Sequence, residues 1–486
     1  MGGFLERPRW QLGICLLVGL ALRAPLFGDP YIHVDEAFYF LVGQEMHHGA
    51  IPFVDIWDRK PVGLFLLYYL IGGISRSVWS YQIAAWLFAS GTAFTVCRIA
   101  MLWAKPRAAV LGGIAYLSGA LIVDGVGGQA PIFYNLPMAI AAWCVASSLG
   151  DLESGRVARK VYVAMALCGI AITIKQTTLF ESLFFGAFSL VALWRSEAPR
   201  QSVLRFALIA ATLGAVPTVA TAVFYAGIGH WHDFWQAMVV SNLSKPRPEG
   251  LLIYIRAVVL LIILGPLWFA AFCGMFFLES VSGFDPYRRF MKGWIAAALL
   301  GFVSVPNFYY HYGLPLLVPF GVAAATFYAR PIIGTAMLTL LVGYSIYRIH
   351  LYDFSRWAQA RWRMDDLASA IRQHDLGRGL LVFDGPPSLY FMTGNHPMSP
   401  LAFPHHLHHA IERNVSQFDT ATEVRRIIAR RPGAVVLEPK IINVPTNFDS
   451  RMVVMEYVAR RCRFIDGQII PMQLRKETVV VFGDCR

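Results

Sequence analysis

The chain has 486 residues, of which 56% are hydrophobic and 15% are charged, whereas an ordinary soluble domain carries about 25% charged residues. One soluble core cannot bury so many apolar side chains, which excludes an ordinary soluble protein. The net charge of +12 does not indicate a nucleic-acid partner, because the lysines and arginines stand mainly in short segments between apolar runs, where they orient membrane helices.

Apolar runs of about 17 to 25 residues, long enough to cross a ~30 Å hydrocarbon layer, recur between Gln11 and His350. They predict about eleven transmembrane helices. No small-residue cleavage site follows the first run, so we expect it to remain as a membrane anchor and not to be removed as a signal peptide. The candidate spans are 11–27, 81–103, 108–123, 131–149, 161–174, 178–194, 206–226, 253–278, 294–305, 313–328 and 332–349.

One further apolar run, residues 61–74, would be only about 21 Å long as a helix. If it does not cross the membrane, the basic segments RPR, KPR, GRVARK, RSEAPRQSVLR and DPYRRFMK all fall on one side. The positive-inside rule makes that side the cytoplasm. We therefore expect 61–74 to be an interfacial or re-entrant helix on the outer face of an inner (plasma) membrane, with a cytoplasmic N-terminus.

After His350 the composition changes. ARWRMDDLASAIRQH has the pattern of an amphipathic helix, and GLLVFDG, AVVLEP and TVVVFGD have the pattern of short buried strands. The sequence predicts a transmembrane module, 1–350, with an external first loop at 28–78, followed by a small α/β domain, 351–486. This last domain is expected on the periplasmic or extracellular side.

The first loop carries the densest set of ionisable residues. Its segment YIHVDEAFYFLVGQEMHHGAIPFVDIWDRKPVG includes His33, Asp35, Glu36, Asp55, Asp58, Arg59 and Lys60. Ionisable groups next to hydrocarbon are costly and tend to serve function. Neighbouring helical residues point about 100° apart, so one of Asp35 and Glu36 can face a substrate while the other holds a loop or an ion. The plain alternative is a solvated loop with surface ion pairs, which the aromatic and apolar neighbours disfavour.

HVDEAFYF after the first span, followed by GAIPFVDIWDRKPVG, resembles the protein O-mannosyltransferase-like glycosyltransferases of the GT-C superfamily. GIAITIKQTTLF resembles the span of that family that ends in an external lysine, and NFYYHYGLPLLVP resembles its entry into a late helix. The resemblance covers about residues 1–350. Its members include protein mannosyltransferases, lipid A aminoarabinose transferases and bacterial galacturonosyl or arabinofuranosyl transferases, which take sugar from a polyprenyl-phosphate carrier.

The resemblance implies a GT-C fold and a transferase that acts on a polyprenyl-phosphate-linked hexose or pentose at the outer face of the membrane. The acceptor would be a glycan, a lipid or a protein, and a divalent cation (Mg²⁺ or Mn²⁺) is an optional cofactor. Asp35 matches the first acidic residue of the family and is assigned as general base, with Glu36 beside it. The residues expected to bind the donor phosphate are Lys60, Arg59, Lys175 and His311. Those expected to contact the substrates are His33, Tyr39, Asp55, Asp58 and Tyr312.

Several of these residues have plainer interpretations. Lys175 at the end of a span could extend its ammonium group to the membrane interface, and His311 could simply pack among aromatic rings. FPHHLHHAIERN contains four histidines, two of which at positions i and i+4 could bind a metal on a helix. No third ligand has a clear spacing, so a solvated helix start is expected there.

Two other classes of protein remain as alternatives. A lipid or solute transporter or flippase would also have many spans and charges within the membrane, but transporters favour internal repeats and broken helices at the bilayer midplane. Here the charges gather in the first loop. A non-catalytic lipid-binding relative is the second alternative, which the presence of Asp35, Glu36 and Lys60 disfavours.

Cys462 and Cys485 both fall in the predicted external domain, where a disulfide is permitted. A bridge between them would join the end of the chain to the domain. Two free thiols are the equal alternative, since the strand pairing that would bring the two residues together cannot be derived from the sequence.

Overall fold

The computed structural model describes residues 2–244, 251–277, 285–305, 307–439 and 445–486. The described residues form two compact units. The first unit comprises the described residues within Met1–Ala24, Ile83–Thr221 and Pro248–Leu351, and the second comprises those within Pro25–Gln82, Ala222–Arg247 and Tyr352–Arg486. The first loop is therefore part of the same unit as the C-terminal segment.

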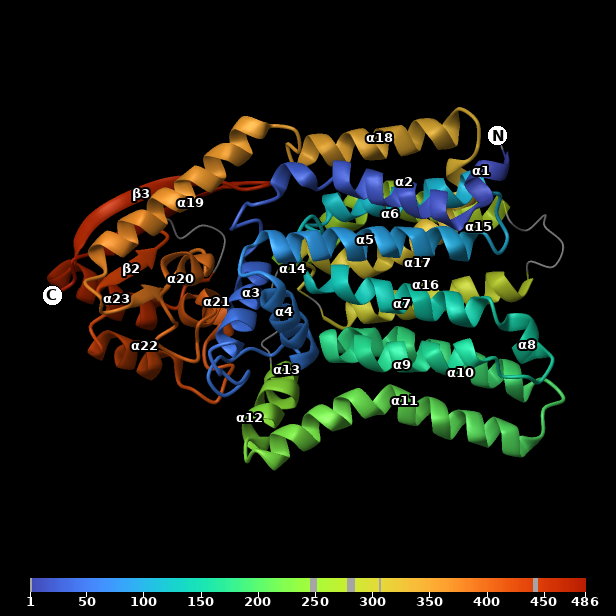
Figure 1. Ribbon diagram of the computed structural model, residues 1–486, viewed down its shortest axis with the longest axis horizontal. Coiled ribbons are helices and arrows are strands. Elements are labelled where there is room, and N and C mark those ends of the chain that lie inside the picture. The colour runs from blue at the N-terminus through green and yellow to red at the C-terminus, as the bar shows by residue number, and fades with distance from the viewer. Residues whose placement is uncertain (1, 245–250, 278–284, 306, 440–444) are drawn as a thin grey trace. The chain divides into compact units, whose positions relative to one another are not determined.

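The first unit is a bundle of apolar helices (Figure 1). In chain order its elements are α1 (Gly2–Glu6), α2 (Pro8–Ala21), α5 (Trp79–Ala100), α6 (Pro106–Ile122), α7 (Ala130–Ala146), α8 (Leu149–Glu153), α9 (Arg159–Ile174), η2 (Gln176–Thr178), α10 (Leu179–Trp194), α11 (Arg200–Gly227), α14 (Leu251–Ile263), α15 (Gly265–Phe277), α16 (Asp285–Val303), η5 (Tyr310–Leu316), α17 (Leu317–Tyr328) and α18 (Ile333–Arg348). The first residues of α5 and the last of α11 belong to the second unit.

Close packing in this bundle depends on small residues and on aromatic side chains. A Cβ atom on Gly112 of α6 would lie only 2.6 Å from the carbonyl oxygen of Gly321 on α17, so glycine allows these two backbones to approach. Elsewhere Phe185 of α10 stacks on Phe290 of α16 at 5.9 Å between ring centres. Trp294 of α16 donates a 2.6 Å hydrogen bond to Glu181, which satisfies a buried carboxylate.

Three helices among the described residues are long and apolar enough to cross a membrane: 79–100, 176–194 and 200–227. The predicted span 253–278 differs from the structure. It is divided into α14 and α15, which bend by 56° at a break after Ile263, and its last residue, Leu278, lies outside the described residues. Pro266 follows Gly265 at this point and has no N–H for the helical ladder, which explains the break. The total of eleven spans stays a prediction.

The second unit contains α3 (Val34–Met46) and α4 (Val62–Ile74) from the first loop. Gly43 of α3 brings the two helices together, because a Cβ there would lie 2.7 Å from the Tyr68 backbone. The opposite face of α4 exposes Leu66, Leu70 and Ile74, spaced four residues apart. The interfacial or re-entrant position expected for this helix stays a prediction.

The remainder of the second unit contains a four-stranded sheet together with further helices (Figure 1). Its elements are η1 (Ala24–Leu26), α12 (Trp231–Trp235), η3 (Gln236–Val240), α13 (Ser241–Leu243), α19 (Phe354–His374), β1 (Leu380–Val382), α20 (Ser388–Thr393), α21 (Pro404–His408), η6 (Ala410–Glu412), α22 (Thr420–Ala429), β2 (Ala434–Leu437), α23 (Phe448–Arg461), β3 (Arg463–Pro471) and β4 (Lys476–Gly483).

The strand order is β1-β2-β4-β3. β1 and β2 are parallel, with Leu381 opposite Val435, and every residue in both strands is buried. β4 is antiparallel to both β2 and β3. Its buried residues alternate with more exposed ones, so only one of its faces lies in the core.

The pairing of β3 with β4 also decides the state of the last two cysteines. Arg463 lies opposite Gly483, which brings the residues just before β3 and just after β4 together. Cys462 and Cys485 form a disulfide there, with their Cα atoms 4.0 Å apart. The first of the two alternatives for these cysteines is therefore confirmed.

We expect the Cys462–Cys485 disulfide to stabilise the second unit by roughly 3 kcal/mol, the chain-entropy value for a loop of this size. The double variant Cys462→Ser with Cys485→Ser should lower the free energy of unfolding of that unit by this amount. Limited proteolysis at increasing urea concentration measures the change, and the buried free thiol of Cys97 provides the control through Cys97→Ser. Equal protease resistance with and without the bridge would contradict the expectation.

Candidate active site

The first loop positions its acidic residues by capping α3. His33 has an extended backbone, and its Nδ1 accepts a 3.2 Å hydrogen bond from the backbone N–H of Asp35. Because Nδ1 is an acceptor, the neutral ring carries its proton on Nε2. Asp35 and Glu36 occupy the first helical turn, where the positive end of the helix dipole stabilises carboxylates.

The two adjacent carboxylates point into different surroundings. Glu36 is 0% exposed and lies close enough to Tyr68 and Tyr81 to act on both hydroxyl groups electrostatically. The side chain of Asp35 is 14% exposed, and one of its oxygens lies 3.8 Å from His33 Nδ1. Asp35 is therefore the carboxylate of this pair that solvent or a substrate can reach.

Asp58 organises the turn that leads into α4. One of its oxygens accepts hydrogen bonds from the backbone N–H groups of Arg59 (2.5 Å) and Lys60 (3.2 Å), and it lies 4.0 Å from the Lys60 ammonium. Asp58 is itself buried. This side chain therefore holds Arg59 and Lys60 in place through the backbone.

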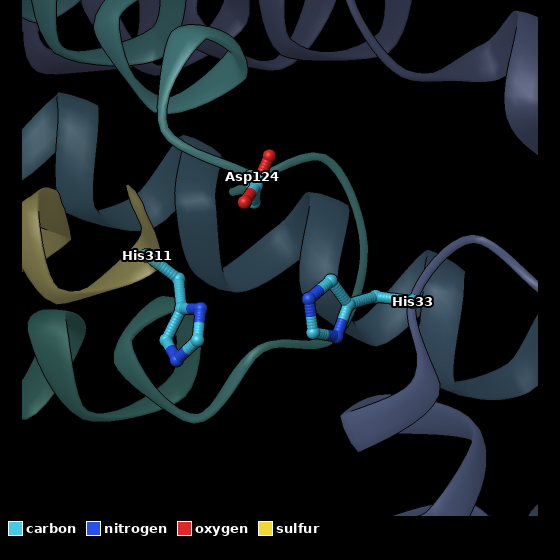
Figure 2. Close-up of side chains that lie close together, drawn as sticks. All are labelled: His33, Asp124 and His311. Carbon is cyan, nitrogen blue, oxygen red and sulfur yellow. The ribbon is translucent and has the colours of Figure 1, made fainter. Parts of the chain in front are cut away.

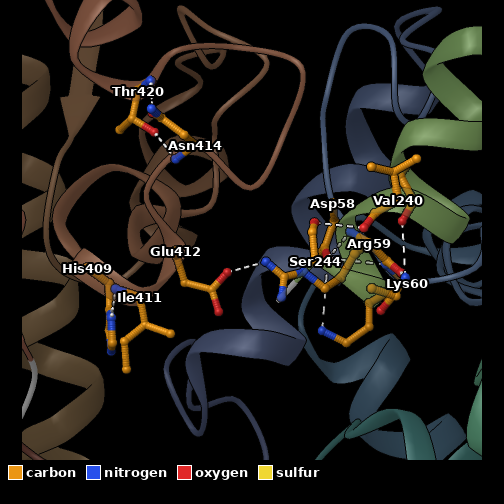
Figure 3. A network of polar contacts seen from close by, with 12 residues as sticks. Asp58, Arg59, Lys60, Val240, Ser244, His409, Ile411, Glu412, Asn414 and Thr420 are labelled. Carbon is orange, nitrogen blue, oxygen red and sulfur yellow. Dashed lines mark hydrogen bonds and ion pairs between the residues drawn. The ribbon is translucent and has the colours of Figure 1, made fainter. Parts of the chain in front are cut away.

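Arg59 and Lys60 leave this turn toward different partners. Arg59 forms an ion pair with Glu412 of η6 (Figure 3), while its buried Nη1 has no hydrogen-bond partner among the described residues. The Lys60 ammonium lies 5.4 Å from the ring centre of Tyr39 on α3, within range of a cation–π contact. Lys60 therefore stands beside a buried aromatic ring, in the same unit as Asp35.

The segment that carries Glu412 has hydrogen bonds of its own (Figure 3). His409 caps η6, because its Nδ1 accepts a 3.2 Å hydrogen bond from the Ile411 backbone. Asn414 and Thr420 exchange two hydrogen bonds, of 2.9 and 3.0 Å, just beyond Glu412. The partner of Arg59 is thus presented by a short, well-connected segment of the C-terminal part of the chain.

Asp55 has a structural role in its turn. It is exposed, and its Oδ2 accepts a 2.8 Å hydrogen bond from the backbone N–H of Ile51. The backbone groups of Phe53 and Ile56 are also hydrogen-bonded, at 2.7 Å. Its expected contact with a substrate stays a prediction.

The structure corrects the expectation for the histidines at 405–409. A solvated helix start was expected, but His406, His408 and His409 are only 3 to 8% exposed. His408 lies 3.3 Å from the buried Asp384 carboxylate, which explains why it leaves the solvent. Among the described residues, these histidines are in no group of three ligands close enough to share a metal ion.

His405 was not assigned a role from the sequence. Burial lowers its pKa, while the carboxylates of Asp35 and Glu412 act in the opposite direction. This neutral ring therefore lies within the electrostatic reach of Asp35. The run of histidines after Pro404 was the only feature of the sequence that could have drawn attention to His405. Nothing in the sequence relates residue 405 to residue 35.

We expect His406 to make the second unit sensitive to acid. Burial lowers the pKa of His406 to about 4, and its ring packs edge-on against Trp57 and Phe403. The unfolded chain binds a proton near pH 6.5 and the folded chain only near pH 4. The free energy of unfolding is therefore highest above pH 6.5. As the pH falls from 6.5 to 4, protonation of His406 in the unfolded chain lowers it by up to about 1.4 kcal/mol per pH unit.

His406→Phe should remove this part of the pH dependence. The measurement is the thermal midpoint in detergent, followed by tryptophan fluorescence between pH 7.5 and 4.5. His232→Phe, at an exposed position on α12, should keep the wild-type pH dependence. A midpoint that falls equally for wild type and His406→Phe would show that His406 is not the source.

The remaining predicted residues, Lys175, His311 and Tyr312, belong to the first unit. The Lys175 ammonium lies 5.6 Å from the ring centre of Tyr312. Tyr312 meets His311 edge-on at 4.7 Å between ring centres. The structure therefore brings these three side chains together, at the start of η5 and the end of α9.

Asp124, which sequence analysis did not single out, belongs to the same group. A carboxylate oxygen of Asp124 lies within 4.8 Å of a ring nitrogen of His311 (Figure 2). Asp124 follows α6 with a left-handed backbone, φ = 57°. Asp124 could have been found from the sequence as an acidic residue directly after a predicted span, in the segment VDGVGG.

Comparison with solved structures identifies the architecture. The chain matches ArnT from Cupriavidus metallidurans in the apo state with a TM-score of 0.59 and 14% identity, and it matches ArnT from the same organism bound to undecaprenyl phosphate with a TM-score of 0.54 and 15% identity. Each match covers 97% of both chains. The chain has the GT-C fold.

The GT-C fold that the sequence predicted is thus confirmed over nearly the whole chain. No model of a known protein family matches the chain, and a search of curated proteins also finds no match. Because the sequence identity is only 14 to 15%, the likeness to ArnT shows the fold alone.

Proposed function

We propose that this chain is a membrane glycosyltransferase that moves a sugar from a polyprenyl-phosphate donor to an acceptor on the extracytoplasmic face. The observation that carries the proposal is the GT-C fold shared with ArnT over 97% of both chains, in one case with undecaprenyl phosphate bound to ArnT. The motif HVDEAFYF and the DRKPVG turn both lie in the second unit and supply residues suited to this chemistry.

Asp35 is the proposed general base. In the transfer step, the acceptor hydroxyl oxygen bonds to the anomeric carbon while the bond from that carbon to the phosphate oxygen breaks. The hydroxyl proton passes to the Asp35 carboxylate, and the electron pair of the broken bond remains on the phosphate. A positioned carboxylate accelerates such a step because the neutral hydroxyl is a poor nucleophile at pH 7.

Arg59 and Lys60 are the proposed partners of the departing phosphate. Negative charge develops there during transfer, and fixed cations in a site of low dielectric stabilise it. The free Nη1 of Arg59 and the ammonium of Lys60 supply donors for phosphate oxygens. Glu36, which is buried, would keep the first turn of α3 in place.

The proposal predicts that cells without this chain lack one sugar on an envelope glycolipid or glycoprotein. Mass spectrometry of envelope glycolipids and glycoproteins, with and without the chain, should show loss of one glycoform and recovery on expression of the wild type. Identical glycan profiles in the two strains would count against a transferase.

A further inference from the structure

A second cluster of polar residues lies at the other end of α3, outside the proposed transfer site. Glu45 is in the last turn of α3, His48 follows the helix, and His396 comes from the loop after α20. The ligand atoms of these three side chains all lie within 4.8 Å of one another. Both Glu45 oxygens are 2.9 to 3.0 Å from His396 Nδ1.

We propose that Glu45, His48 and His396 form a binding site for a divalent transition-metal ion of the Zn²⁺ class. Two imidazoles and one carboxylate are a set of ligands that Zn²⁺ takes in proteins, with a fourth position left for water. With bonds of about 2.0 to 2.1 Å, ligand atoms around a tetrahedral ion lie about 3.3 Å apart. The spacing in this cluster needs only small side-chain movements to reach that value.

The position of Glu45 also calls for a cation. Its side chain is nearly buried and stands at the C-terminal end of α3, where the negative end of the helix dipole destabilises a carboxylate. A bound metal ion would offset both the burial and the dipole.

His396 is presented by a well-ordered turn. Gly394 ends α20 with a left-handed backbone, φ = 73°. The amide of Asn395 donates hydrogen bonds to Asp375 (3.1 Å) and Thr393 (3.0 Å). Because these contacts fix the residue just before His396, its backbone needs little ordering when the side chain, which is 60% exposed, binds an ion.

The neighbouring His47 does not belong to the cluster, because its ring contacts Tyr69. Its Nε2 lies 2.8 Å from the Tyr69 carbonyl oxygen, and its ring stacks on Tyr69 at 4.1 Å. His48 is exposed and meets His396 edge-on at 4.9 Å between ring centres. A metal ion would therefore join the end of α3 to the loop after α20.

The test uses the full chain without a polyhistidine tag, purified in detergent and freed of metal with a chelator. Zinc chloride is titrated against a chromophoric competitor, and the bound metal is counted by elemental mass spectrometry. The wild type should bind one Zn²⁺ tightly. Glu45→Gln and His396→Asn should each weaken binding at least about 100-fold, since even residues that merely orient metal ligands contribute 10- to 100-fold.

His374→Asn is the matched control, because His374 also contacts a carboxylate, Asp484 at 3.2 Å, and should leave zinc affinity unchanged. Zinc affinity that survives Glu45→Gln and His396→Asn would overturn the proposal, as would a wild type that binds no zinc. If a variant is not monodisperse, the visible spectrum of Co²⁺ bound to the wild type decides. Four- or five-coordinate absorption supports the site, and a six-coordinate spectrum contradicts it.

Discussion

Replacing Asp35 with Asn should lower the rate of sugar transfer about 10²- to 10⁴-fold, the usual contribution of a positioned general base. Asn has nearly the same shape as Asp but cannot accept the proton of the acceptor hydroxyl. The backbone hydrogen bond from Asp35 to His33 remains in the variant, so the cap of α3 should be preserved.

The measurement is single-turnover transfer from a polyprenyl-phosphate-linked sugar by the purified chain. Asp449→Asn is the matched control, because Asp449 is a more exposed carboxylate of the second unit that pairs with Arg413 on the surface. This control should transfer sugar at the wild-type rate. Wild-type turnover by Asp35→Asn would assign the base to another group.

Replacing Lys60 with Met should raise the donor KM about 10- to 100-fold, the equivalent of roughly 1.4 to 2.8 kcal/mol for a lost charge-assisted contact to phosphate. Methionine retains an unbranched apolar chain that can pack against Tyr39. The loss should therefore come from the charge, and the acceptor KM should change much less.

Arg76→Met provides the comparison for Lys60→Met, because Arg76 is an exposed cation in the segment after α4. Its donor KM should equal that of the wild type. If Lys60→Met leaves the donor KM unchanged while the protein remains folded, Lys60 does not bind the phosphate.

Much of the local structure could be predicted from the sequence. The apolar run 61–74 forms α4 at almost the expected bounds, with Pro61 just before the helix. β1 and β2 lie within their predicted strand segments, and β4 begins two residues before the third segment, at Lys476. These features follow from local patterns of apolar residues and turns. β3 was missed because RFIDGQIIP mixes exposed and buried positions and contains a register shift near Phe464.

The errors have two physical origins. The break between α14 and α15 was signalled by Gly265 and Pro266, but hydropathy alone treated the run as one span. The partners of Arg59 and of the histidine cluster could not be predicted, because the ion pair of Arg59 with Glu412 joins residues 353 positions apart. Such contacts depend on the packing of the whole second unit.

The central claim is that the chain breaks the bond between sugar and lipid phosphate. The most direct test reconstitutes the wild-type chain in liposomes with a polyprenyl-phosphate donor that carries radiolabelled sugar, together with an extract of envelope acceptors. We expect free polyprenyl phosphate to appear in a one-to-one ratio with labelled acceptor, and only with the active protein. Donor that crosses the bilayer or remains bound with its sugar still attached would contradict the claim and indicate a flippase or a lipid-binding protein.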